Sequence, residues 1–467
     1  MKISDYLPKT ILSIVLLMFL SILCLPAPLL AKNMSDTADE IRQLRNTMKI
    51  LMQRINTLEK EVGKYKDTVA DVREAKKQQE SLKKAVGEIE RIKEALGHLD
   101  ISGGVTSVVQ GTSGNDDGDA TDAAFTMDLN LATHFGSYGS FYVHLEGGDG
   151  GGIQDHVPSF SIPNYDAYDT KNENDQSGVT ISEAFYEFNF LDDRLGFDIG
   201  KMDISVLFDE NEVAGDETTQ FLSNIFVKSM GMTIPEPDNF YCPALMVHYA
   251  PIDLLEFRFV GASVKADNWD NLFSHSHRFM ALQANFRPEI MGRHGNYRFY
   301  VWRDDRRHLN NKKVGSIPKE YQGRYDYSSA DRDQNGWGLS FDQEITDGIR
   351  GFARYSQTED DIAHYTGDEW EVIPFDKTWS IGADFSGKMW GREDDVLGIA
   401  FGQTILTDDY EKVNSHTANE SYLEAYYRIM LHERFAVSPD FQWIKNAGGN
   451  SRADDIYIFG VRGQLDF

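Results

Sequence analysis

Two hydrophobic periodicities divide this sequence. From about residue 36 to residue 98, apolar residues recur at alternating spacings of three and four with charged residues between them, which is the heptad pattern of a coiled coil. After Gly103 the spacing changes to two, so that apolar and polar side chains fall on opposite faces of extended segments. The pattern therefore predicts an α-helical coiled coil over residues 33–100 and an all-β domain over residues 101–467.

The coiled-coil prediction depends on ten consecutive heptad positions, followed by a stammer at Ala75 before the repeat resumes at Leu82. Branched residues at a with Leu at d favour dimers, but Met48 and Tyr65 weaken that preference. We expect a homo-oligomer, a trimer in preference to a dimer. An oligomerisation stalk is the expected role, and a docking helix for another envelope protein is the alternative. The ten positions are Ile41, Leu44, Met48, Leu51, Ile55, Leu58, Val62, Tyr65, Val69 and Val72.

The first 32 residues have the pattern of a secretory signal peptide. Lys2 and Lys9 precede an apolar run over residues 11–25, and Leu29-Leu30-Ala31 offers a cleavage site. Removal of this segment would leave Cys242 as the one cysteine of the exported chain. An intramolecular disulfide is then excluded.

The dyad repeat of residues 101–467 is compatible with two architectures that bury opposite faces. A soluble sandwich packs its apolar face inside, whereas a transmembrane barrel turns that face to lipid. We count about sixteen segments of roughly 9–11 residues, the length that a tilted strand needs to cross a bilayer. They are 101–110, 123–134, 138–147, 179–190, 194–203, 241–250, 253–264, 277–287, 295–304, 334–345, 349–358, 377–387, 395–404, 419–430, 433–444 and 453–467.

The connections and the last segment favour the transmembrane barrel. Short connections such as 136–137 and 251–252 alternate with long polar ones such as 147–178 and 204–240, as in bacterial outer-membrane barrels with an even strand count. Counting back from Phe467, every second residue of the final segment is Leu, Gly, Val, Phe and Tyr. This end resembles the signal that the barrel assembly machinery recognises on outer-membrane proteins. We therefore expect an all-β transmembrane barrel of about sixteen antiparallel strands in the bacterial outer membrane, preceded by the coiled coil in the periplasm.

Two blocks of the chain resemble the carbohydrate-selective porin (OprB) family. The first is GKMDISVLFDENEVAGDETTQFLSNIF at residues 200–226; the second comprises AYYRI at 425–429, VSPDFQ at 437–442, NAGGN at 446–450 and GVRGQ at 460–464. The likeness covers roughly residues 180–467 and implies a sixteen-stranded diffusion channel for sugars. Two features depart from the family pattern: the added coiled coil, and Gly215 in place of the usual polar residue.

A channel of this kind selects solutes by the groups that line its lumen. The connection 204–240 is the expected constriction loop, because its apolar piece 221–226 would be costly to leave in water. For every candidate, ordinary solvation of the lumen is the alternative to a role in selectivity. The constriction-loop candidates are Asp216, Glu217, Gln220 and Phe221; the pore-lining candidates are Glu183, Glu187, Lys201, Asp203, Glu256, Arg258, Arg298, Arg354, Glu424, Tyr426, Arg428 and Arg462.

Composition and motifs exclude several other functions. The formal net charge is −28, which argues against a nucleic-acid partner because phosphates are bound by Lys and Arg. The GGDGGG stretch at 147–152 lacks the Lys-Ser/Thr of a phosphate-binding loop. His275 and His277 have no visible third metal ligand, and the acidic stretches 115–119 and 359–361 lack a calcium-binding register. We expect no enzyme activity, no metal site and no cofactor, with loop-bound Ca²⁺ as an open alternative.

The sequence thus predicts an outer-membrane porin, a water-filled channel in contact with outer-membrane lipid that passes small hydrophilic solutes, with sugars preferred by resemblance. One alternative is a porin for siderophores or metal complexes. Another is a structural tether between the outer membrane and the cell wall, in which the barrel is mainly an anchor.

Overall fold

The computed structural model divides the chain into two units, residues 1–97 and 98–467. In the first unit, residues 83–84 and 86–87 are described and are helical, so the predicted signal peptide and nearly all of the predicted coiled coil lie outside the described residues. The described residues are 83–84, 86–87, 99–116, 118–166, 178–231, 241–263, 272, 278–310, 332–360, 362–363 and 374–467.

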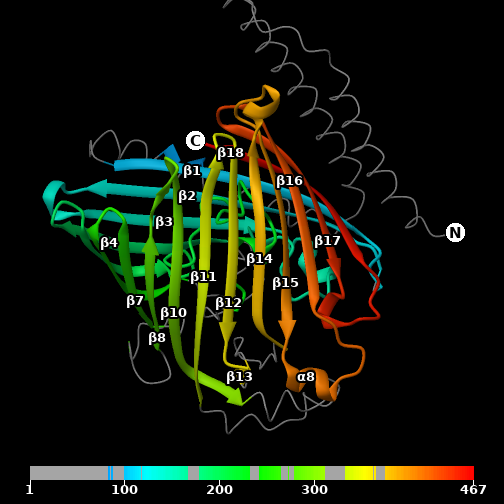
Figure 1. Ribbon diagram of the computed structural model, residues 1–467. Helices are drawn as coiled ribbons and strands as arrows, with labels where there is room; N and C mark the ends of the chain where they lie inside the picture. Colours follow the sequence, from blue (N-terminus) through cyan, green and yellow to red (C-terminus); the bar gives the residue numbers. More distant parts are fainter. Residues whose placement is uncertain are drawn as a thin grey trace, which may run out of the picture. The chain divides into compact units, whose positions relative to one another are not determined.

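The second unit is a closed barrel of sixteen long antiparallel strands (Figure 1). Each predicted segment corresponds to one of them, so the predicted strand count is confirmed. Two further strands of two residues, β9 (Glu289–Ile290) and β13 (Ile362–Ala363), pair with β10. The sixteen are β1 (Leu99–Ser113), β2 (Thr121–His134), β3 (Ser140–Asp149), β4 (Val179–Phe190), β5 (Leu195–Asp203), β6 (Tyr241–Ile252), β7 (Leu255–Ser263), β8 (Arg278–Phe286), β10 (Arg293–Asn310), β11 (Arg332–Thr346), β12 (Ile349–Thr358), β14 (Phe375–Ser386), β15 (Val396–Leu406), β16 (Glu420–His432), β17 (Phe435–Lys445) and β18 (Ile456–Asp466).

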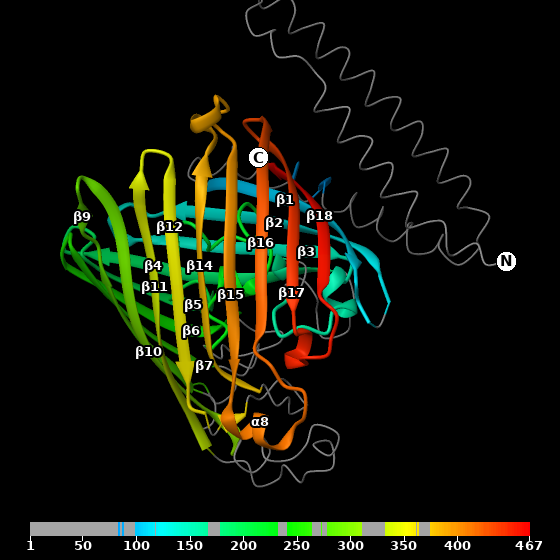
Figure 2. The same cartoon turned by 45° about the vertical axis from the view of Figure 1, so that its right-hand side comes forward.

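The first and last strands close the barrel. β1 pairs with β2 on one side and with β18 on the other, in a register that runs from Gly104 opposite Asp466 to Ser113 opposite Tyr457. Beyond that ladder, Gly103 N donates to the Phe467 carbonyl (3.1 Å) and Phe467 N donates to the Gly103 carbonyl (2.9 Å). Figure 2 shows this seam, where the red C-terminal strands lie beside the blue first strand. Each of the sixteen long strands is therefore paired on both sides, as a barrel in lipid requires.

The two faces of the wall differ in chemistry as the dyad repeat predicts. The outward positions are apolar, and several are well exposed in the isolated chain, among them Val109 at 50% and Phe459 at 50%. Many inward positions are polar or charged, such as Glu424, which is 0% exposed, and Arg462, which is 1% exposed, and others are apolar residues such as Phe279 and Trp302 that lie under the inward loops. This inversion relative to a soluble sandwich is what a barrel surrounded by lipid needs.

Short and long connections lie at opposite ends of the strands. Those after β2, β4, β6, β8, β11 and β16 are short, and those after β3, β5, β7, β10, β12, β15 and β17 are longer; the connections after β1 and β14 are of intermediate length. Within the described residues, no helix is long and apolar enough to cross a bilayer. The described helices of the second unit are short: η2 (Gly136–Tyr138), η3 (Ile153–His156), α5 (Asn224–Val227), η5 (Gly387–Trp390), α8 (Asp408–Val413) and η6 (Ala447–Gly449).

A bulge in β4 changes which residues of that strand face the lumen. His144 pairs with Glu183 and Leu145 with Ile181, so that Ser182 is an extra residue in β4. Ser182 points inward, where its hydroxyl donates to Glu146 Oε2 (2.8 Å). Before the bulge the odd-numbered Ile181 is exposed on the outer face at 55%, whereas after it Glu183 and Glu187 are the odd-numbered residues on the inner face. A bulge shifts the side-chain alternation in this way because it inserts one residue into one strand.

Candidate functional site

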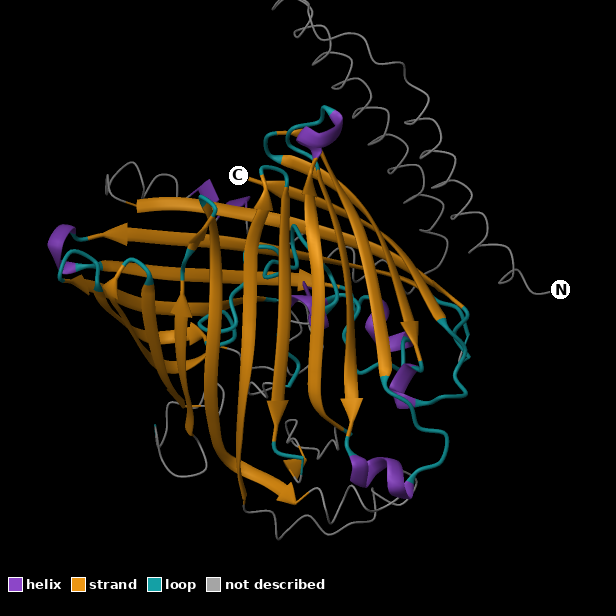
Figure 3. Cartoon of the chain, in the orientation of Figure 1, coloured by secondary structure: helices purple, strands orange, loops and turns teal. Residues whose placement is uncertain are grey.

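The connection between β5 and β6 folds into the barrel. Its described part, residues 204–231, includes α5 and carries apolar side chains that are almost fully buried. Figure 3 shows such loop segments and α5 inside the ring of strands. Burial of these side chains removes apolar surface from water at about 25 cal/mol per Å², which favours a folded loop inside the lumen. The side chains that are at most 1% exposed include Ile204, Phe208, Val213, Phe221, Leu222 and Phe226.

Arg354 on β12 holds this loop from the opposite wall. Its Nη1 donates to the Ala214 carbonyl (2.6 Å) and to the Phe226 carbonyl, and its Nη2 donates to the Asp209 carbonyl (2.9 Å). The guanidinium also pairs with the Asp209 carboxylate at 3.1 Å, and that carboxylate accepts from Ser229 N (2.7 Å). Arg354 is 3% exposed. The structure therefore places this pore-lining candidate beneath the loop, as an anchor.

Three more candidates hold the loop from the C-terminal strands. Glu424 on β16 accepts from Leu222 N (2.6 Å) and from Ser223 N (3.0 Å). The Tyr426 ring meets the Phe221 ring edge to face, with centroids 5.0 Å apart. Arg462 Nη1 on β18 donates to the Glu217 carbonyl (2.7 Å), and its guanidinium lies 5.8 Å from the centre of the Tyr426 ring. These side chains orient the loop and are themselves covered by it.

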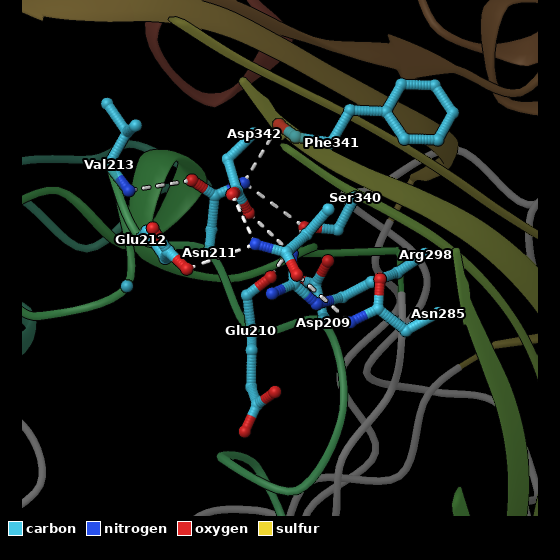
Figure 4. A network of polar contacts seen from close by, with 12 residues as sticks. Asp209, Glu210, Asn211, Glu212, Val213, Asn285, Arg298, Ser340, Phe341 and Asp342 are labelled. Atoms are coloured by element: carbon cyan, nitrogen blue, oxygen red, sulfur yellow. Dashed lines mark hydrogen bonds and ion pairs between the residues drawn. The ribbon is translucent and has the colours of Figure 1, made fainter. Parts of the chain in front are cut away.

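A polar network on β10 and β11 holds the first half of the loop (Figure 4). Asn211 Nδ2 donates to Ser340 Oγ (3.2 Å) and to the Phe341 carbonyl (3.1 Å). Ser340 Oγ in turn donates to the Glu210 carbonyl (2.9 Å). On the same wall Arg298 pairs with Asp342 at 2.5 Å, and both side chains are about 5% exposed or less. The candidate Arg298 is therefore a buried ion-pair residue.

In the DETTQ turn at 216–220, the polar side chains accept hydrogen bonds from backbone groups of the turn itself. Asp216 Oδ1 accepts from Thr218 N (2.9 Å) and Thr219 N (3.2 Å), and Gln220 Oε1 accepts from Gly215 N (2.7 Å). These bonds satisfy backbone donors at the turn. The adjacent Glu217 is half-buried. Loss of water around its carboxyl raises the pKa of Glu217 to about 7, with Lys228 acting in the opposite direction.

A second loop, between β3 and β4, also enters the lumen, and sequence reasoning missed it. Its described part ends at Asp166, whose carboxylate accepts from Thr126 Oγ1 on β2 (2.9 Å to Oδ2). Phe160 N donates to Glu420 Oε1 (2.8 Å), and the Pro163 carbonyl accepts from Gln442 Nε2 (2.8 Å). The signal was present in the sequence, because this otherwise polar connection contains Ile153, Val157, Phe160, Ile162 and Tyr165.

The two loops are bonded to each other as well as to the wall. Tyr165 N donates to the Leu222 carbonyl (2.9 Å), and Asn224 N donates to the Ile162 carbonyl (3.1 Å). Ser161 Oγ lies 2.7 Å from Ser223 Oγ. Together the loops form one hydrogen-bonded body that reduces the open cross-section of the lumen.

Five of the remaining pore-lining candidates face the interior. Glu183 accepts from Asp203 N (2.9 Å), so it lies where the constriction loop begins, and Asp203 itself is buried at that point. Glu187 accepts from Asn189 Nδ2 (2.6 Å). Glu256 pairs with Arg258 (2.5 Å) and Arg258 with Glu210 of the loop (2.5 Å). A further candidate, Arg428, is half-buried near the short-connection end of β16.

Lys201 differs from the expectation. In β5 it pairs with Ala184. It lies two residues after Ile199 and therefore on the same face of the strand. Ile199 is 52% exposed on the outer face. Its ammonium donates to the Ile181 carbonyl (3.0 Å) beside the β4 bulge. Lys201 is therefore on the lipid-facing side of the wall, and its placement in the lumen is corrected. The error arose because Lys201 was assigned from its position at the strand end and not from the two-residue alternation of side chains along β5.

The structure also brings into the lumen residues that the sequence reasoning did not select. Asp128 on β2 and His144 on β3 are bonded across the strands (2.9 Å), and Tyr142 donates to Asn130 Oδ1. The ring of Tyr142 lies 5.0 Å from that of Phe185. The two-residue alternation along β2 and β3 was sufficient to predict that Asp128, Tyr142 and His144 face the lumen.

No metal site is formed by the described residues, among which no group of three His, Cys, Asp or Glu side chains could hold an ion. His275 and His277 lie outside the described residues. Loop-bound Ca²⁺ therefore stays an untested alternative.

Fold and lumen together define the class of this protein, an outer-membrane β-barrel porin, which is a channel and not an enzyme. The wall is closed and apolar outside, the interior is polar, and two inward loops narrow it. The family model described as "Carbohydrate-selective porin, OprB family" matches residues 114–467, which is well over half of the chain. The chain belongs to this family, as the two sequence blocks indicated.

The solved structure of one porin agrees with this chain at the level of the fold. OprB of Pseudomonas putida in its high-pH structure is 17% identical, and the match covers 81% of this chain and 96% of that chain with a TM-score of 0.66. OmpF of Salmonella typhi is 12% identical over 79% of this chain and 97% of its own, with a TM-score of 0.48. The uncharacterized protein alr4550 of Nostoc sp. is 29% identical over 138 residues, which is 28% of this chain and 22% of that protein's length.

Proposed function

We propose that this protein is a passive channel for small hydrophilic solutes, with neutral sugars preferred, and that the loops after β3 and β5 form its constriction. A sixteen-stranded barrel without inward loops leaves a wide aqueous lumen. The observation that supports a selective constriction is the hydrogen-bonded body formed by residues 150–166 and 204–231, which is anchored by Arg354, Glu424 and Arg462.

A sugar preference is supported by the chemistry of the inner wall beside this body. A pyranose ring presents an apolar face and a rim of hydroxyls, so it binds where an aromatic ring lies next to hydrogen-bonding groups. The half-buried rings of Tyr142 and Phe185 are tilted by 45° at 5.0 Å. Asn130 accepts from the Tyr142 hydroxyl, and Glu187 lies two residues beyond Phe185 on the same face of β4. Family membership supports the same solute class.

Osmotic swelling of liposomes that contain the purified protein tests the proposal. We expect hexoses and disaccharides to enter faster than zwitterionic amino acids of similar size. Phe185→Ala should slow sugar entry several-fold, whereas Phe188→Ala on the outward face of the same strand serves as the matched control. Equal rates for sugars and amino acids, with no effect of Phe185→Ala, would remove the sugar assignment.

We also propose that residues 33–100 form a periplasmic coiled coil that joins the chains into a homo-oligomer, most readily a trimer. The support is the heptad pattern alone. Deletion of residues 36–98, with the mass of the detergent-solubilised complex as the readout, should convert an oligomer into a monomer that still conducts. If the deletion detaches the outer membrane and leaves solute uptake unchanged, a tether is the better description.

We propose finally that the C-terminal strand, ending in Phe467, is the segment that the barrel assembly machinery recognises. The support is its alternating pattern and the exposure of Phe467, which is 46% on the outer surface. Phe467→Ala should lower the amount of folded barrel in the membrane of cells without changing the conductance of the channels that do assemble.

A further inference from the structure

The inner wall of the barrel is covered very unequally. On β11 to β18 most inward side chains are almost completely buried, with Arg350 and Arg428 as exceptions, whereas several inward side chains of β2, β3 and β4 are half-buried. Asp128 retains 26% of its side-chain exposure, and His144 and Glu183 retain 14% each. The buried inward residues, all at most 3% exposed, include Ser340, Arg354, Ser380, Thr404, Glu424 and Arg462.

The cause is the position of the loop body. Its described residues are bonded to inward side chains all along the β7 to β18 wall, through Gln283, Arg354 and Glu424 among others. Its bonds to the β2 to β4 wall include His156 with Asp122 (3.2 Å) and Asp166 with Thr126 (2.9 Å), both in the half of β2 next to the long connections. Glu183 also accepts from Asp203 N, where β5 ends and the constriction loop begins. Nearer the short connections, the inner faces of β2 to β4 carry half-buried side chains that water reaches.

The charges on this open sector have one sign. The inward face of β2 to β5 carries the half-buried Asp128, Glu183 and Glu187, and the more deeply buried Glu146 and Asp198, with His144 among them; these described strands place no Lys or Arg on that face. Lys201 is the nearest basic residue of β5 and faces outward.

The opposite side of the open sector is less basic than the arginine content of the lumen suggests. The loop body presents Asp216 and Glu217 together with Lys228. Arg354, Arg298 and Arg462 are buried against loop carbonyls or Asp342. Arg258 is paired with Glu210 and Glu256. Arg350 and Arg428 lie farther away, near the short connections of β12 and β16, and Arg350 is paired with Asp384.

We propose that solutes pass along the β2 to β4 sector, between that wall and the loop body, and that this route makes the channel select cations over anions. A narrow passage lined by one sign of charge, with low-dielectric walls, concentrates counter-ions and excludes co-ions. The negative charge of the passage does not slow neutral sugars, whereas it slows the entry of sugar phosphates and other anions. The proposal rests on the protein being a channel and adds the position of its path and the sign of its selectivity.

The reversal potential across a planar bilayer under a KCl gradient tests the sign. We expect a permeability ratio of K⁺ to Cl⁻ well above one for the full chain, and a several-fold fall in that ratio for the double variant Asp128→Asn with Glu187→Gln. Glu289→Gln removes one negative charge from a short connection outside the lumen and should leave the ratio unchanged. Anion selectivity, or a double variant that behaves like Glu289→Gln, overturns the proposal. A protein with no conductance at all contradicts the channel function instead.

Cysteine labelling tests the route independently of charge. Cys242 is 0% exposed, so the parent chain should not respond to a membrane-impermeant cationic thiosulfonate. Glu187→Cys on the open sector should lose most of its current within minutes of reagent addition, whereas Ser380→Cys on β14, beneath the loop body, should keep it. Block of Ser380→Cys with an unaffected Glu187→Cys would place the path on the other side of the loop body and overturn the proposal. Heat-modifiable migration on gels confirms that each variant is a folded barrel.

Discussion

At the scale of single residues, the charged side chains of the lumen have two different roles. Arg354, Glu424 and Arg462 are buried and are bonded to the backbone of the constriction loop, so they determine where the loop lies. Glu183 and Glu187 are half-buried on the open wall, so they are in contact with water. The dyad repeat predicted that all five face inward. It could not separate the two groups, because the separation depends on contacts with residues more than a hundred positions away.

Arg354→Gln should weaken the attachment of the constriction loop. Removal of one member of a buried ion pair costs about 3–5 kcal/mol, and three loop carbonyls lose their donor at the same time. We expect single-channel currents that are larger and noisier than those of the parent chain. Arg303→Gln, which affects an exposed pair with Asp333, is the control, and identical currents from both variants would contradict the anchoring role.

Asp395, before β15, provides a pH-dependent contribution to stability. Its burial would raise the pKa of this carboxyl, but hydrogen bonds from Arg392, the Tyr427 hydroxyl (2.6 Å) and Met430 N (3.0 Å) outweigh burial and lower it. Because the pKa is lower in the folded chain, the stabilisation is present above the unfolded value of about 3.9 and is lost as the pH falls through the folded value.

Asp395→Asn should therefore reduce the free energy of unfolding at pH 7 by about 1–3 kcal/mol, as expected for hydrogen bonds to a charged group. Below the folded pKa of Asp395, the difference between the variant and the parent should shrink. Urea unfolding of the barrel in lipid, followed by tryptophan fluorescence at several pH values, measures both effects. A difference that is constant from pH 7 to pH 2 would contradict the assignment.

At the scale of elements, all sixteen long strands were predictable, because lipid outside and water inside impose a two-residue alternation on every strand of such a barrel. The bulge at Ser182 was not predictable from the sequence, since an inserted residue can be recognised only from the pairing of β4 with β3. The loop after β5 was predictable from its apolar piece 221–226. The loop after β3 was missed because its apolar residues are separated by polar ones and follow a glycine-rich stretch.

The seam between β1 and β18 is an element on which closure depends. A Cβ atom on Gly103 would lie 2.3 Å from the Asp128 carbonyl oxygen and 2.8 Å from the Phe467 ring. Gly103→Val should therefore prevent tight closure and lower the fraction of heat-modifiable, folded barrel. Gly463 in β18 has nothing within 4 Å of its Cβ position, so Gly463→Ala should fold like the parent chain. Equal folding of the two variants would show that this seam tolerates displacement.

At the scale of the whole molecule, the acidic and aromatic composition follows from the architecture. Many aromatic side chains occupy outward positions, as in the cluster formed by Phe188, Phe190 and Phe197, whereas many acidic side chains line the interior. The net charge of −28 indicated an acidic protein but not an acidic path. The proposed path follows from the position of the loop body, which covers Arg354 and Arg462 on the opposite wall.

Single-channel conductance in a planar bilayer, with sugar titrated on one side, tests the central claim most directly. The expected result is a stable open channel whose ionic current falls in a saturable way as a hexose or disaccharide is added, because the sugar occupies the constriction. The current should keep its preference for K⁺ throughout the titration. A purified, folded barrel that conducts no ions, or a channel whose current no sugar reduces, would contradict the account.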